Sequence, residues 1–306
     1  MAALNQDIVN RPNSCKYCRS THVIKYGIDK GTQMYYCREC DRKFARIDTL
    51  PQMHTRTADI AEALDLYYAG LSLNDIRRNF IDQDNNYFST ATIYNWIKRF
   101  TDAAIKKTTE QQPRVGDSWL FKEITIGIDQ GKVKVQDAYL KSRSARKVTL
   151  WLILDARSRY LLSFQLKNSI SSPDFQELLE IASRRAGKEP ALIITDKAVN
   201  FLQKSEKADT TMLEGRVILQ FDPGLISTFN DILDERTRFA CALKNQSTLE
   251  KFMQGWLVHY NFFKSQFRLG NKTPAQTASI NSSYGDWKGL IEGLYVVTVK
   301  NEPVTR

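Results

Sequence analysis

The stretch Ile124-Thr-Ile-Gly-Ile-Asp129 alternates in the manner of a β-strand, is rich in β-branched residues and ends on a carboxylate. A second run, Ala191-Leu-Ile-Ile-Thr-Asp196, ends in the same way. Mg²⁺ and similar hard cations prefer oxygen ligands, and two-metal phosphoryl transfer needs carboxylates held rigidly close together. The two runs therefore predict strands that can place Asp129 and Asp196 in one divalent-metal site.

Further elements are expected around these two runs. The alternating patterns predict a meander of strands, followed by an amphipathic helix over 174–185 that turns Phe175, Leu178, Leu179 and Ala182 inward. The strands are expected at Lys132–Val135, Val148–Asp155 and Tyr160–Leu166. A second amphipathic helix is expected over 249–263, with Phe252, Trp256, Tyr260 and Phe263 inward and His259 in a structural role. Antiparallel strands, a helix and then a further strand are the order of an RNase H-like core, so the predicted fold class is α/β, a mixed sheet with flanking helices.

Composition and charge restrict the class of protein. The chain has 306 residues, a formal charge of +10 and 42% hydrophobic residues, which suits a globular protein of two or three domains with a polyanionic partner. We find no apolar run near the ~20 residues that span a bilayer, and no signal-peptide pattern at the start. We therefore expect a cytoplasmic protein with reduced cysteines and no membrane partner.

Four cysteines form two pairs near the start of the sequence. Cys15-Lys-Tyr-Cys18 and Cys37-Arg-Glu-Cys40 are separated by eighteen residues, and two such turns can complete a tetrahedral thiolate shell for zinc. Residues 1–50 are therefore predicted to form a zinc ribbon. Seven Lys/Arg against three Asp/Glu between 15 and 44 permit contact with a DNA backbone, although a purely structural ribbon stays open.

Residues 51–112 have helical patterns typical of a helix-turn-helix domain. Helices are expected over 58–69, ended by Gly70, over 73–80, capped by Ser72, and over 90–100. The last helix would bury Ile93, Trp96, Ile97 and Phe100. Its outward side chains suit base edges and phosphates, and those expected to bind DNA are Thr90, Thr92, Asn95, Lys98 and Arg99. An ordinary helical bundle is the alternative, and a linker is expected at Lys106, Lys107 and residues 111–113.

Several motifs together resemble DDE transposases, and most closely the insertion-sequence-six group with its archaeal relatives. They span about residues 12–280 and include the cysteine pairs, Tyr67-Tyr-Ala-Gly-Leu-Ser-Leu73, Ser89-Thr-Ala-Thr-Ile-Tyr-Asn-Trp96, Thr195-Asp196, Gly255-Trp-Leu-Val-His-Tyr-Asn261 and Lys272-Thr-Pro-Ala275. The resemblance implies a catalytic domain over 113–285, followed by a tail over 286–306. It also implies Asp129 and Asp196 as the first two acids, with two Mg²⁺ or Mn²⁺ ions between them and a third acid. The implied partners are double-stranded DNA of transposon ends and targets and further copies of the chain, as a homodimer or higher oligomer associated with the nucleoid.

The third acid is ambiguous. The relatives carry it early in a helix, in a segment like Asn-Asn-x-x-Glu-Arg, and here the Glu-Arg pair at Glu235 stands one residue late, with Asp234 at the expected offset from Asn230. Counting back from Gly255 instead leads to Ser227, which is no ligand. We expect Glu235. The first motif also departs, since Asp129 is followed by Gln130 and Gly131 where the relatives have Glu and Thr.

These patterns leave more than one function open. The first is a transposase that binds transposon ends and performs metal-dependent DNA cleavage and strand transfer. The alternative is a catalytically impaired, transposase-derived DNA-binding protein, favoured by the unusual residues after Asp129 and by the uncertain third acid. A zinc-dependent transcription regulator would explain residues 1–110 and would leave the two carboxylate-ended strands without a role.

Overall fold

A computed structural model describes residues 14–18, 20–29, 32–45, 49–50, 53–84, 86–128, 146–167, 172–195, 210–213, 217–221, 246–282 and 284–301. Asp129, Asp196 and Glu235, the alternatives Asp234 and Ser227, and the expected strand Lys132–Val135 lie outside these residues. The chain falls into two compact units, which are described separately. One comprises 1–65, 88–100 and 283–306, and the other 66–87 and 101–282.

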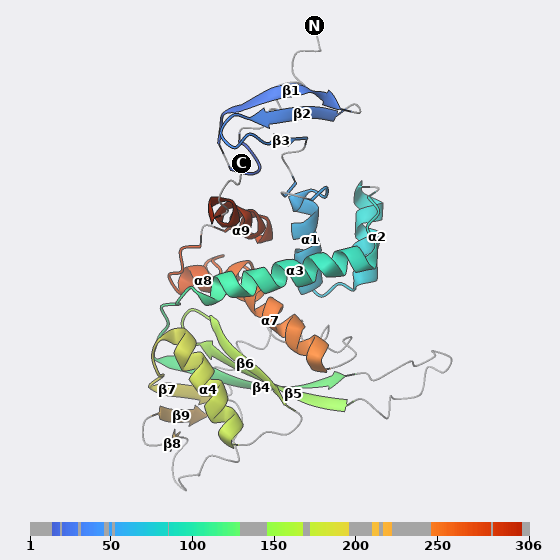
Figure 1. Ribbon diagram of the computed structural model, residues 1–306. Helices are drawn as coiled ribbons and strands as arrows, with labels where there is room; N and C mark the ends of the chain where they lie inside the picture. The colour runs from blue at the N-terminus through green and yellow to red at the C-terminus, as the bar shows by residue number, and fades with distance from the viewer. Residues whose placement is uncertain are drawn as a thin grey trace, which may run out of the picture. The chain divides into compact units, whose positions relative to one another are not determined.

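The first unit begins with a small antiparallel sheet. Strands β1 (Val23–Asp29), β2 (Thr32–Cys37) and β3 (Lys43–Phe44) pair in the order β1-β2-β3 (Figure 1). Among the described residues, its buried core comprises Tyr35, Phe44, Cys15 and Cys37. Strands β1 and β2 form an antiparallel hairpin, and so small an apolar core gives the segment little stability of its own.

Three helices contain residues of this unit, namely α1 (Thr57–Tyr68), α3 (Thr90–Thr109) and α9 (Trp287–Asn301), and the first two continue into the other unit. Helix α2 (Leu73–Asp84) belongs to the second unit. Gly70 follows α1 with a positive φ of 104°, and the side chains of Ser72 and Ser89 accept the backbone N–H groups of Asp75 and Thr92. The three expected helices are therefore present, Gly70 and Ser72 act as expected, and Ser89 is a further cap that the sequence analysis did not predict.

Two features of the helices differ from what the sequence predicts. Helix α3 continues to Thr109, so Lys106 and Lys107 lie in its last turn and not in a linker. The helix can extend this far because basic side chains near a helix C-terminus interact favourably with the helix dipole. The next proline, which would end a helix, is Pro113. The sequence after Tyr284 suggested no element, yet α9 forms there and buries Trp287, Leu290 and Ile291. In the part of the chain that the structure describes, none of the helices has the length and apolar character needed to cross a membrane.

Asp65 on α1 makes the stability of the first unit depend on pH. Burial, with smaller contributions from the carboxylates of Asp286 and Glu62, raises the pKa of Asp65 from 3.8 to about 6. The folded state thus holds this proton more tightly than the unfolded state, so its contribution to stability is present below about pH 4 and is lost as the pH rises through about 6.

Asp65→Asn is therefore expected to stabilise the protein at pH 7. The pKa shift corresponds to about 3 kcal/mol, and partial exposure of the side chain reduces the expected gain to about 1–2 kcal/mol. Urea unfolding at pH 4.5 and pH 7 measures it, with the exposed Asp102→Asn as control. Equal gains in both variants, or the same gain at both pH values, would contradict the assignment.

The second unit is built on a six-stranded mixed sheet. Its strands pair in the order β6-β5-β4-β7-β9-β8. They are β4 (Ser118–Ile128), β5 (Arg146–Asp155), β6 (Leu161–Lys167), β7 (Leu192–Thr195), β8 (Thr210–Leu213) and β9 (Val217–Phe221). The pairs β4–β5, β5–β6 and β8–β9 are antiparallel, while β4–β7 and β7–β9 are parallel.

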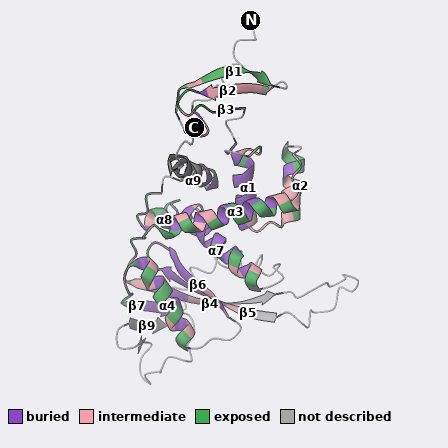
Figure 2. Ribbon diagram, in the orientation of Figure 1, coloured by how far each residue is buried: buried purple, intermediate pink, exposed green. Residues whose placement is uncertain are grey.

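Helices pack on this sheet through aromatic and polar contacts. Helix α4 (Ser172–Ala186) places Phe175 edge-on against Phe121 and Trp151, and Phe175, Leu178 and Ala182 are fully buried as expected. The helix ends at Gly187, which has a φ of 71°. Helix α7 (Gln246–Phe262) buries Phe252, Trp256 and Tyr260, and Figure 2 shows buried residues along α7, β5 and β6. A 3₁₀ turn (Phe267–Leu269) and the short α8 (Pro274–Thr277) follow.

Asn261, at the end of α7, is bonded to the edge strand β6. Its side-chain oxygen accepts the Leu161 N–H at 2.9 Å, and its side-chain nitrogen donates to the Leu161 carbonyl at 2.9 Å. The amide is completely buried. It therefore pairs with the strand backbone at a position where a neighbouring strand would otherwise do so.

Candidate nucleic-acid interface and metal centres

The four cysteines converge on one point. Their sulfur atoms all lie within 4.8 Å of one another, and the structure has no other group of three or more potential metal ligands among the residues it describes. Cys15 Sγ lies 3.7 Å from Cys40 Sγ, and Cys18 Sγ lies 3.5 Å from Cys37 Sγ. A tetrahedron of sulfurs about 2.3 Å from zinc has edges of about 3.8 Å, so the four residues fit that ion.

Backbone donors favour thiolate at one side of the cluster. Burial raises the pKa of Cys37, but hydrogen bonds from the backbone of Cys40 and Glu39 outweigh it and leave the pKa lowered to about 7. Burial and the neighbouring thiols raise the pKa of Cys40. Four crowded thiols cannot all ionise unless a cation lies between them. A bound zinc ion would supply that positive charge.

The N-terminal half of α3 separates buried from exposed side chains as the sequence predicts. Ile93, Trp96, Ile97 and Phe100 are buried, whereas Tyr94, Asn95, Lys98 and Arg99 are exposed and Thr90 and Thr92 are half-buried. An amide, two hydroxyls and two cations therefore share the solvent side of one helix. This set can form hydrogen bonds to base edges and ion pairs with phosphates.

The ends of β4 and β7 do not lie level with each other. The last pair between these parallel strands is Phe121 with Thr195, and β7 ends there. Strand β4 continues for seven residues to Ile128, about 23 Å at 3.3 Å per residue (Figure 1). Among the described residues, this part of β4 pairs with β5. Asp129 follows Ile128 and Asp196 follows Thr195. The ions of a two-metal site lie about 4 Å apart, far less than this offset between the strand ends. Both aspartates lie outside the described residues, and their shared metal site stays a prediction.

Two residues that sequence reasoning did not select lie on β4 beside the end of β7. Lys122 and Glu123 directly follow Phe121, the partner of Thr195. The Glu123 carboxylate accepts a hydrogen bond of 3.2 Å from the indole N–H of Trp151, its partner on β5. The only sequence signal is the polar pair Lys122-Glu123 inside an otherwise apolar strand, a position where charge requires a reason.

Asp155 is a further carboxylate of this unit, but it has a structural role. It is completely buried at the end of β5 and accepts hydrogen bonds from the backbone N–H groups of Gly116 and Ser158, both at 2.7 Å, and from the Ser158 hydroxyl at 2.5 Å. These bonds hold the turn into β6. Both oxygens have partners within the protein, which leaves Asp155 unsuited to a metal.

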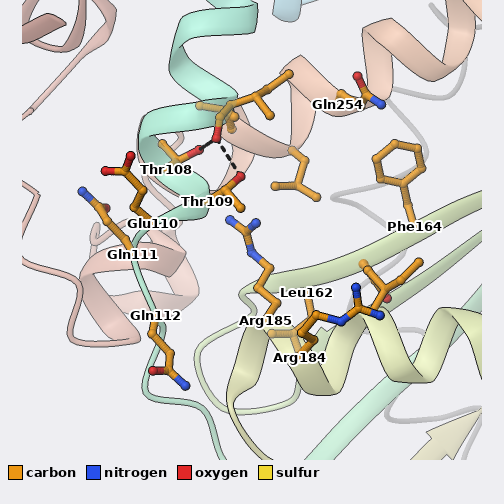
Figure 3. Close-up of a pocket in the computed structure, with 15 residues that line it drawn as sticks. Thr108, Thr109, Glu110, Gln111, Gln112, Leu162, Phe164, Arg184, Arg185 and Gln254 are labelled. Atoms are coloured by element: carbon orange, nitrogen blue, oxygen red, sulfur yellow. Dashed lines mark hydrogen bonds between the residues drawn. The ribbon is translucent and has the colours of Figure 1, made fainter.

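A cavity of about 660 Å³ lies between the end of α3, β6, α4 and α7. Its apolar wall includes Leu162, Leu257 and Val258, and Figure 3 shows Arg184 and Arg185 on α4, with Gln111 and Gln112 on the segment after α3. Arg185 also donates to the Tyr160 hydroxyl at 2.9 Å. Among the described residues that line the cavity, Glu110 alone carries a carboxylate. Two guanidinium groups and one carboxylate disfavour a divalent cation, so this cavity is not a two-metal site.

The strand order defines the class of this unit as an RNase H-like core. Three antiparallel strands are followed by a helix, and the next strands lie parallel to the first strand on its other side. The described residues confirm the α/β fold class, and the cysteine cluster is compatible with a zinc ribbon.

The chain is similar to known proteins in structure and not in sequence. No protein family and no curated protein matches the sequence. Among solved structures, the HTLV-2 integrase catalytic core domain with magnesium has a TM-score of 0.36 and 16% identity over 55% of this chain and 97% of its own. The Drosophila P element transposase strand transfer complex has a TM-score of 0.36 and 12% identity over 56% of this chain and 42% of its own. A pre-cleavage Mos1 transpososome has a TM-score of 0.31 and 10% identity over 83% of this chain and 82% of its own. The fold assignment rests on the strand order, because these scores are too low to carry it.

Proposed function

We propose that this chain is a DNA-binding protein of the transposase type, which recognises a double-stranded sequence through the N-terminal half of α3. The exposed Asn95, Lys98 and Arg99 above a fully buried apolar face are the observation that carries the proposal. The net charge of +10 supports a polyanionic partner. A protein that brings two DNA ends together needs more than one copy, so the proposal includes a homodimer or higher oligomer.

Two candidate functions differ in the fate of the bound DNA. In the first, Asp129, Asp196 and Glu235 hold two Mg²⁺ or Mn²⁺ ions and the protein cleaves DNA and transfers strands. The sequence resemblance and the RNase H-like strand order support it. In the second, the chain keeps the fold and binds DNA without strand transfer. The seven-residue offset between the ends of β4 and β7 supports the second candidate, which we therefore favour.

A cleavage assay separates the two candidates. DNA flanking the gene is searched for terminal inverted repeats, and an oligonucleotide with that end is bound to purified protein with Mg²⁺ or Mn²⁺ present. Under the favoured candidate the DNA is bound and stays intact. Nicking that is lost in Asp129→Ala and in Glu235→Ala would instead establish the first candidate, and loss in Asp234→Ala alone would move the third ligand to that residue.

Base reading by α3 makes a second prediction. Asn95→Ala is expected to reduce discrimination between the specific and random duplexes by about 1–3 kcal/mol, because an amide can bond a base edge with two hydrogen bonds. Lys98→Ala is expected to weaken binding to all duplexes alike, because an ammonium group contacts phosphate. It should also reduce the slope of log binding constant against log salt concentration by about 1.

Fluorescence anisotropy over a range of salt concentrations measures both effects. Lys106→Ala is the matched control, since Lys106 is an exposed lysine in the last turn of the same helix. Equal affinity of the wild-type protein for specific and random DNA would refute base reading. An equal loss in Lys98→Ala and Lys106→Ala would refute this face of α3 as the contact.

A further inference from the structure

Lys122 lies on the central strand beside the end of β7. The parallel register pairs Phe121 with Thr195, the last residue of β7, and Lys122 is the next position along β4. A carboxylate that shared metal ions with a ligand just after β7 would have to project from this level, because neighbouring strands lie about 4.8 Å apart. The residue there is a lysine.

Glu123, the next residue, does not replace the missing carboxylate. Side chains alternate along a strand, so Glu123 faces the side of Phe121, opposite to Lys122. That side is occupied by aromatic rings. Phe121 lies 5.1 Å from Trp151 and 5.0 Å from Phe175 between ring centroids, and the Trp151 indole donates to Glu123. Glu123 is thereby held by the packing beneath α4.

We propose that Lys122 makes this core independent of divalent metal: its ammonium supplies, in covalent form, the positive charge that a bound ion would bring to the end of β7. An ammonium at this place repels a divalent cation and attracts the phosphate of a DNA backbone. The core can therefore hold a phosphodiester without activating water against it. This inference rests on the proposed function and explains how a transposase-type fold would bind DNA and leave it intact.

The test is a Mn²⁺ titration of the zinc-loaded, full-length protein without DNA. Isothermal titration calorimetry and electron paramagnetic resonance monitor the binding. The wild type is expected to bind no Mn²⁺ at submillimolar concentration. Lys122→Asp is expected to gain one site, with affinity raised at least about tenfold, because it adds a carboxylate beside the end of β7. Lys122→Met, which removes the charge and adds no ligand, is the matched control and is expected to gain none.

Double variants locate the gained site. In the Lys122→Asp background, Asp196→Ala should abolish Mn²⁺ binding and Asp129→Ala should leave it unchanged. Binding of Mn²⁺ by the wild type that is lost in Asp129→Ala would overturn the proposal. So would a Lys122→Asp protein that melts like the wild type and binds no Mn²⁺. Should that variant fail to fold, the wild-type titration with Asp129→Ala still decides.

The DNA titration of the same proteins keeps the two proposals apart. Failure to bind any specific duplex would refute the proposed function and leave the metal result standing. Loss of duplex affinity in Lys122→Met, with the α3 surface unchanged, would support a phosphate contact by Lys122. An unchanged affinity would overturn that part of the inference.

Discussion

Purified protein is expected to contain one zinc ion per chain, and Cys37→Ser is expected to lose it and to unfold the segment that contains β1, β2 and β3. Among the described residues, the buried core of this segment consists of Tyr35, Phe44, Cys15 and Cys37, and the last two belong to the cysteine cluster. Zinc binding by such small domains contributes about 10–16 kcal/mol at neutral pH, so the folded state depends on the ion. A chelator should have the same effect as the substitution.

Metal analysis by mass spectrometry and circular dichroism measure this result. Cys241→Ser is the control, because Cys241 is the fifth cysteine and lies outside both Cys-x-x-Cys pairs of the sequence. It should retain one zinc ion. A wild-type protein without zinc, or an unchanged zinc content in Cys37→Ser, would show that the four sulfurs do not form a metal site.

Asn261→Leu should lower the free energy of unfolding by about 3–5 kcal/mol. Leucine has the same branched skeleton of four side-chain heavy atoms as asparagine, but the backbone N–H and carbonyl of Leu161 both lose their partner. A buried polar group left without a hydrogen bond costs about 1–3 kcal/mol. Urea unfolding monitored by tryptophan fluorescence provides the measurement.

Gln254→Leu is the matched control for this substitution. Gln254 lies on α7 and is exposed, so the same exchange of an amide for an apolar side chain should change stability by no more than about 0.5 kcal/mol. Equal effects of the two substitutions would mean that the Asn261 amide contributes nothing specific to the attachment of α7 to β6.

Much of the fold could be predicted from the sequence because its elements have clear periodicity. Phe175, Leu178 and Ala182 follow the helical period and are buried on α4, and the alternating run 148–155 is β5. The cysteine spacing sufficed for the metal cluster, since two Cys-x-x-Cys turns can satisfy only a few geometries.

The offset between the ends of β4 and β7 could not be predicted in this way. Both runs end on aspartate, and this common ending suggested two strands that end side by side. Strand β4 has eleven residues and β7 has four, and their register is fixed by packing of side chains that lie far apart in sequence. Periodicity reports which face a residue occupies and does not report which neighbour it is beside. Lys122 was overlooked for the same reason.

The bond between Asn261 and Leu161 joins residues 100 positions apart, which has a consequence for biosynthesis. At about 5–20 residues per second, a ribosome finishes Leu161 some 5–20 s before it adds Asn261. During that interval the outer edge of β6 has an open N–H and carbonyl, in a strand that other chains can pair with. A nascent chain of this protein is therefore most exposed to aggregation, and most in need of a chaperone, between the completion of its sheet edge and the synthesis of α7.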